Sequence, residues 1–112
     1  MEIKISDDQK VTVVAISGSV DGLTAGNLMT ALGEQVKKGN IHLVADFDQV
    51  DYISSAGLRA LLATVKDARQ HGGDFRLARV RPVVHKVLEL SGFTSILKLY
   101  DDATAAVASF GG

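Results

Sequence analysis

The start of the chain is predicted to form two strands, because apolar and polar residues alternate there. Residues 2–6 alternate in this way, and residues 10–17 are rich in Val and Ile. A period of two places one face of a strand in the core and leaves the other toward water. A short polar turn at residues 7–9 separates the two segments. The pattern therefore predicts an antiparallel hairpin.

The remaining chain alternates between helical and strand patterns. Apolar residues recur every three or four positions in four segments, which predicts helices. Thr24 is expected to cap the first of them, and Pro82 to begin the third. The predicted helices cover residues 24–38, 58–70, 82–90 and 102–109, and the predicted strands between them cover residues 41–47, 74–80 and 96–100.

The resulting order is β-β-α-β-α-β-α-β-α, which predicts one α/β domain over residues 1–112. Strands separated by helices form right-handed crossovers and hence a parallel sheet, and the hairpin adds an antiparallel pair. We therefore expect a mixed, mostly parallel sheet of about five strands with about four helices. Functional residues of such sheets collect beyond the carboxyl ends of the strands. Two predicted loops, residues 17–24 and 47–57, lie there.

Composition narrows the classes of function. The chain has 112 residues, a formal net charge of −1 and no cysteine. A near-neutral balance argues against a nucleic-acid partner, and the lack of cysteine excludes disulfides and thiolate metal sites. Apolar runs are far shorter than the roughly 18 residues that a spanning helix needs. We therefore expect a cytoplasmic protein without a membrane or nucleic-acid partner.

Motifs of enzymes are not found. The three histidines, His42, His71 and His85, share no metal-ligand spacing, and the sequence contains neither a nucleophile elbow nor a phosphate-binding loop. The acidic residues 46, 48 and 51 raise the alternative of a phospho-aspartate receiver, but a solvated turn is the better interpretation. A small phosphotransfer or nucleotide-binding enzyme is disfavoured for the same reasons. We expect no catalytic residue, no cofactor and no metal site.

A pair of serines opens the second predicted helix. Ser54 and Ser55 precede Ala56 and Gly57, and serine is a preferred N-cap residue. Either serine can supply the cap. The small residues that follow leave the approach of a partner unobstructed, and the N–H groups of a helix N-terminus accommodate a phosphate. This arrangement suggests a phosphorylated serine.

Three segments resemble the STAS domain family, specifically its anti-sigma factor antagonists. Residues 18–25 (Gly-Ser-Val-Asp-Gly-Leu-Thr-Ala) are similar to one family segment, residues 46–58 to the phosphorylation segment, and residues 72–93 to the C-terminal part. The resemblance places the phosphoacceptor at Ser55. Many members carry Asp where this chain has Ser54, so the chain departs from the family pattern there.

The resemblance implies a partner-switching protein without catalysis of its own. The unphosphorylated form would bind an anti-sigma factor that is also a serine kinase of the histidine-kinase-like ATPase fold, and so free a sigma factor. Phosphorylation of Ser55 would release it, and a serine phosphatase would restore it. Tyr52 and Ile53 are expected to pack in the domain. The expected partner-binding residues are Asp21, Thr24, Ser54, Ala56 and Gly57.

One alternative within the same family remains open. The chain can be a STAS interaction module of another system: a stressosome component, a subunit of a lipid transporter, or a partner switch that controls secretion or biofilm formation. The sequence does not distinguish these systems, because the downstream target lies in the partner.

Overall fold

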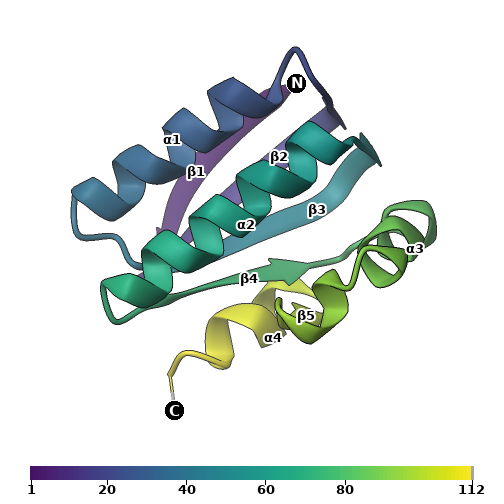
Figure 1. The fold of residues 1–112 in the computed structure, drawn as a ribbon. Helices are drawn as coiled ribbons and strands as arrows, with labels where there is room; N and C mark the ends of the chain where they lie inside the picture. The colour runs from purple at the N-terminus through teal and green to yellow at the C-terminus, as the bar shows by residue number, and fades with distance from the viewer. Residues whose placement is uncertain (112) are drawn as a thin grey trace.

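The structure is a computed structural model that describes residues 1–111, and its order of elements confirms the predicted one (Figure 1). A short 3-10 helix, η1, is the one addition among these residues. The elements are β1 (Glu2–Asp8), β2 (Val11–Val20), α1 (Ala25–Lys37), β3 (His42–Ile53), α2 (Ser55–Gln70), β4 (Asp74–Ala78), α3 (Pro82–Leu90), η1 (Phe93–Ser95), β5 (Leu99–Tyr100) and α4 (Ala103–Ala108).

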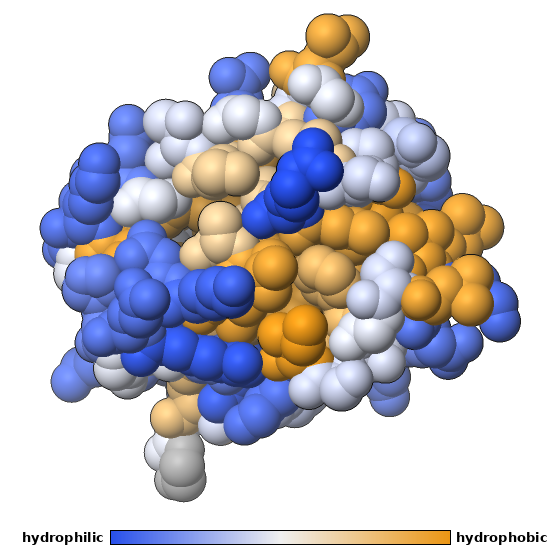
Figure 2. Space-filling view, viewed as in Figure 1, coloured by the Kyte–Doolittle hydropathy of each residue, from blue (hydrophilic) through white to orange (hydrophobic). Residues whose placement is uncertain are grey.

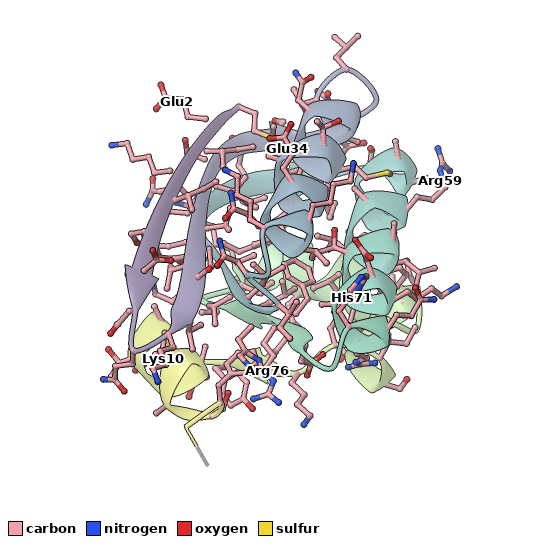
Figure 3. The ribbon with its side chains drawn as sticks, turned by 90° about the vertical axis from the view of Figure 1, so that its left-hand side faces the viewer. Glu2, Lys10, Glu34, Arg59, His71 and Arg76 are labelled. Atoms are coloured by element: carbon pink, nitrogen blue, oxygen red, sulfur yellow. The ribbon has the colours of Figure 1, made fainter. Side chains whose placement is uncertain are left out.

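The five strands form one mixed sheet in the order β1-β2-β3-β4-β5. β1 is antiparallel to β2, and every later neighbour is parallel, as predicted. The carboxyl ends of β2, β3 and β4 therefore point to the same end of the sheet, which we call the carboxyl edge. Figure 3 shows Lys10 at the hairpin tip, at the opposite end of β2 from this edge.

Helices cover both faces of the sheet because strand residues alternate between the two sides. Leu43, Ala45 and Phe47 of β3 are fully buried in the main core, together with residues of α1, α2 and α3. Val44, between them, belongs to a smaller core with Val107 of α4. α1, α2 and α3 thus pack on one face and α4 on the other. Among the described residues, no helix has the length and apolar character needed to span a bilayer.

The predicted turn of the hairpin was wrong in position. β1 continues to Asp8, and the turn consists of Gln9 and Lys10, whose φ angles are 52° and 68°. Positive φ at both central residues is the geometry of a tight two-residue hairpin turn, usually built from Asn and Gly. Gln and Lys are not residues that favour positive φ, so the sequence indicates a turn at the more polar segment Asp7-Asp8-Gln9 instead.

Several strand lengths also differ from the prediction. β3 runs to Ile53 rather than residue 47, so most of the predicted loop 47–57 is strand. β2 continues alongside it to Val20, with register shifts between Ala15 and Ser17 and between Gly18 and Ser19. β5 is only Leu99–Tyr100, because the N–H groups of Ile96 and Leu97 bond to the carbonyl oxygen of Phe93 in the turn that follows η1. These extensions of β2 and β3 form the base of the site described next.

Candidate functional site at the carboxyl edge

The two serines at the start of α2 have different positions. Ser54 is the N-cap: its backbone is extended, and its side-chain oxygen accepts a 3.2 Å hydrogen bond from the N–H of Gly57. Ser55 is the first residue of the helix, and its side chain is exposed. Within residues 1–111, the Ser55 hydroxyl takes part in none of the side-chain hydrogen bonds. The sequence left the cap open between the two serines, and the structure assigns it to Ser54.

The start of α2 lies directly against the end of β2. The N–H of Ser54 donates a 2.8 Å hydrogen bond to the carbonyl oxygen of Val20. Gly57 is buried at this contact, where a Cβ would lie 2.9 Å from the same carbonyl oxygen and 2.7 Å from Cγ1 of Ile53. The structure corrects the interpretation that Gly57 is small in order to leave room for a partner. The glycine is required by the packing of α2 against β2 inside the domain. Its predicted place in the partner surface remains a prediction.

A hydrogen-bonded loop connects β2 to α1. Oδ1 of Asp21 accepts bonds from the N–H groups of Leu23 (2.9 Å) and Thr24 (3.1 Å). The hydroxyl of Thr24 accepts a 2.9 Å bond from the N–H of Asp21 and lies 2.9 Å from the carbonyl oxygen of Ser19, to which it can donate. Thr24 occupies the N-cap position of α1, as predicted, but its side chain makes no capping bond to the helix.

The same bonds set the charge state of Asp21. The hydrogen bond from the N–H of Leu23 lowers the pKa of the Asp21 carboxyl more than desolvation raises it, and the hydroxyl and N–H of Thr24 lower it further. The carboxylate therefore stays ionised at neutral pH. Asp21 and Thr24 direct their polar atoms at each other and at the backbone, so they shape the loop.

The acidic residues that follow Ala45 lie on β3, so the interpretation as a solvated turn was wrong. Asp46 accepts two hydrogen bonds from Arg79, at 3.2 Å and 2.7 Å. This pairing raises the pKa of the Arg79 guanidinium. Asp51 accepts a 3.0 Å bond from the hydroxyl of Ser19. Arg81 donates a 2.6 Å bond to the carbonyl oxygen of Asp48. The acidic residues thus fasten the ends of β2 and β4 to β3.

Exposed apolar side chains surround the serines, and the sequence interpretation missed them. Leu23 is 91% exposed in the β2–α1 loop, and Val83 is 69% exposed in the first turn of α3. Ile53 is buried as expected, but Tyr52 is 51% exposed, so the expectation that it packs in the domain was wrong. A leucine inside the polar segment Asp-Gly-Leu-Thr was the available signal. Ala56 is half-buried.

Known proteins are similar to this chain in sequence and in fold. Residues 2–106 match the STAS domain family. The chain belongs to the STAS domain family. BtrV of Bordetella bronchiseptica, named as an anti-sigma factor antagonist, is 36% identical over 110 residues, which cover 98% of this chain and 95% of BtrV. The predicted family and its anti-sigma factor antagonist group are therefore confirmed.

Solved structures of STAS proteins agree with this assignment. An anti-sigma factor antagonist from Mycobacterium paratuberculosis is 28% identical, with a TM-score of 0.87 over 96% of this chain and 92% of that one. The Bacillus cell fate determinant SpoIIAA, solved in its phosphorylated form, is 14% identical with a TM-score of 0.76, over 97% of this chain and 99% of that one. At that identity the second likeness concerns the fold alone.

Proposed function

We propose that this STAS domain is an anti-sigma factor antagonist that is switched by phosphorylation of Ser55. In its unphosphorylated form it binds an anti-sigma factor with serine kinase activity and thereby frees a sigma factor. The observation that carries the proposal is the division between the two serines. Ser54 is occupied as the cap of α2, whereas the Ser55 side chain is exposed at the helix N-terminus.

The position of Ser55 suits a reversible phosphate. A phosphate on its hydroxyl lies at the positive end of the α2 dipole, where negative charge is favourable, so the domain can carry it without unfolding. The modification adds about −1.5 to −2 charges at pH 7. Added to a formal charge of −1, this makes the chain roughly three times as negative. A partner that contacts Ser55 closely then meets a desolvated dianion, which disrupts the interface.

Ser54, which stands where many family members carry Asp, is compatible with the same mechanism. Ser and Asp are equally good N-caps, so serine at this position keeps the start of α2 in place. It also removes the negative charge that an aspartate would place directly beside the phosphate. We therefore infer that Ser54 is tolerated for its capping oxygen, and that Ser55 remains the acceptor.

The proposed cycle needs two partners, and this chain supplies no catalysis. The kinase, of the histidine-kinase-like ATPase fold, transfers the γ-phosphoryl group of ATP to Oγ of Ser55. ADP leaves and the hydroxyl proton passes to the kinase or to solvent. A serine phosphatase hydrolyses the ester with one water, which returns the hydroxyl and releases inorganic phosphate. The kinase step consumes ATP, which the cytoplasm supplies, so we place the protein in the cytoplasm.

Mass spectrometry with matched serine variants tests the proposal. Each histidine-kinase-like ATPase encoded in the same genome is purified, and the one that binds the wild-type chain is incubated with it and ATP. We expect one phosphate on the wild type and on Ser54→Ala, and none on Ser55→Ala. A phosphate retained by Ser55→Ala would contradict the assignment, and so would a genome in which no kinase of this class binds the chain.

A further inference from the structure

We propose that Leu23 and Val83 are the apolar anchors through which the kinase holds this domain, one on each side of Ser55. The inference rests on the proposed function, because it takes the kinase as the partner. It adds two apolar residues to the partner-binding residues predicted from the sequence. We call Leu23 and Val83 the flanking anchors.

The sheet topology places the flanking anchors on opposite sides of the acceptor. β3 lies between β2 and β4, and all three strands are parallel. Leu23 follows β2, Ser55 follows β3, and Val83 follows β4, so the three residues leave the carboxyl edge from three adjacent strands. Figure 1 shows the β2–α1 loop, the start of α2, and α3 gathered at this end of the sheet.

Both anchors are apolar side chains that the fold itself leaves in water. Leu23 is 91% exposed and Val83 is 69% exposed, so neither adds much to the core. Single exposed apolar side chains are common, but these two follow the strands on either side of the one that leads to an exposed serine. Figure 2 shows hydrophobic surface at the top, where Figure 1 places the β2–α1 loop, and at the right, where it places α3.

The backbone holds both anchors in fixed positions. The N–H of Leu23 is bonded to the Asp21 carboxylate at 2.9 Å, and Thr24 closes the same loop. Val83 stands in the first turn of α3, behind Arg81, whose Nε is bonded to the carbonyl oxygen of Asp48 at 2.6 Å. Little entropy is therefore lost from the backbone of this chain when a partner covers these side chains.

A kinase that phosphorylates Ser55 must also cover the residues on both sides of it, which is why we take the kinase as the partner that contacts the flanking anchors. A specific interface covers about 800 Å² on each partner, or roughly 20–30 residues. An enzyme that reaches the Ser55 hydroxyl must centre its contact on that residue and extend over the loops on both sides. Oδ1 of Asp21 and the hydroxyl oxygens of Thr24 and Ser54 are bonded inside this domain, and Gly57 is buried. The exposed side chains of Leu23 and Val83 remain free for the kinase to cover.

Alanine variants with a matched control test the flanking anchors. Leu23→Ala and Val83→Ala are compared with Leu90→Ala, which removes an equally typical exposed leucine, 75% exposed, from the other end of α3. Binding to the purified kinase is measured by calorimetry with a non-hydrolysable ATP analogue. We expect Leu23→Ala and Val83→Ala each to raise Kd about tenfold or more, and Leu90→Ala to leave it within about twofold.

Phosphorylation of the same variants separates this inference from the proposed function. We expect Leu23→Ala and Val83→Ala to be phosphorylated on Ser55 with a raised KM and an unchanged kcat, because uniform binding is lost and the acceptor is intact. Wild-type affinity in both anchor variants, or an equal loss in Leu90→Ala, would overturn the inference. A wild type that binds the kinase but gains no phosphate on Ser55 would contradict the proposed function, while the Kd comparison would still decide the anchors. If no kinase of this class binds, both fail.

Discussion

The N–H of Ser54 donates a 2.8 Å hydrogen bond to the carbonyl oxygen of Val20. This bond joins the start of α2 to the end of β2, the strand that leads into the loop of Asp21 and Thr24. Gly57 is buried at the same contact, where an added Cβ would lie within 3 Å of Val20 and Ile53. The start of α2, which carries the proposed acceptor Ser55, is therefore attached to the strand that leads into the β2–α1 loop.

Gly57→Ala is expected to destabilise the domain by about 1–3 kcal/mol. The new Cβ would lie 2.9 Å from a backbone oxygen of Val20, so α2 must move away from β2. Urea unfolding measures the change. Gly33→Ala is the matched control, because Gly33 lies within α1 and nothing stands within 4 Å of its added Cβ. That variant should gain up to about 1 kcal/mol from helix propensity. Equal effects of the two substitutions would contradict the packing role of Gly57.

Ser54→Ala is expected to destabilise the domain more than Ser55→Ala. Ser54→Ala removes the oxygen that accepts from the N–H of Gly57, and loss of an N-cap costs about 0.5–2 kcal/mol. Ser55→Ala changes an exposed position and should stay within about 0.5 kcal/mol of the wild type. Thermal unfolding of the two variants side by side checks this. A larger loss in Ser55→Ala than in Ser54→Ala would contradict the assigned cap.

Arg59 is expected to hold the phosphate once it is attached. Arg59 follows Ser55 by four residues on α2, so the two side chains share one face of the helix. Figure 3 shows Arg59 projecting from the N-terminal part of α2. An arginine bonded to a phosphate stabilises it through charge-assisted hydrogen bonds. Phosphorylation should therefore raise Tm more in the wild type than in Arg59→Gln, by a few degrees at low salt. Equal shifts in the two proteins would exclude the contact.

Acid is expected to destabilise the domain through Asp74. Burial raises the pKa of the Asp74 carboxyl, but hydrogen bonds from Arg76 (2.9 Å) and Arg69 (2.8 Å) outweigh it, and the net pKa is lowered. A carboxyl with a lowered pKa in the folded state contributes its stability above the unfolded value of about 3.9, and loses it as the pH falls through the folded value. The difference in unfolding free energy between the wild type and Asp74→Asn should therefore be larger at pH 7 than at pH 3. A constant difference would contradict this role.

The order of elements could be predicted from the sequence because helical and strand periods are strong over most of the chain. The stripe of α2 and the Pro82 start of α3 are examples, and both agree with the structure. The hairpin turn could not be placed, because Gln9 and Lys10 adopt positive φ without the residues that favour it. The length of β3 could not be predicted either. Its polar residues Asp46, Asp48 and Asp51 look like a loop until their partners Arg79 and Ser19, distant in sequence, are known.

The site was predictable as a segment but not as a set of roles. The resemblance picked out residues 46–58 and Ser55, because a serine followed by small residues at a helix start is a local signal. Whether Ser54 or Ser55 caps α2 depends on the hydroxyl direction, which the sequence does not specify. The need for Gly57 depends on how closely β2 approaches, and the exposure of Leu23 depends on a loop closed by its own polar neighbours. These properties depend on the three-dimensional structure, so the sequence alone does not show them.

The affinity of the kinase for phosphorylated and unphosphorylated protein tests the central claim most directly. Wild type carrying a phosphate on Ser55, verified by mass spectrometry, is titrated against the kinase beside the unmodified protein at the same salt concentration. A close interface that must accept a dianion should lose about 2–3 kcal/mol, which is a rise in Kd of roughly 30- to 150-fold. Removal of the phosphate with a serine phosphatase should restore the original Kd. Equal Kd values for the two forms would contradict the account.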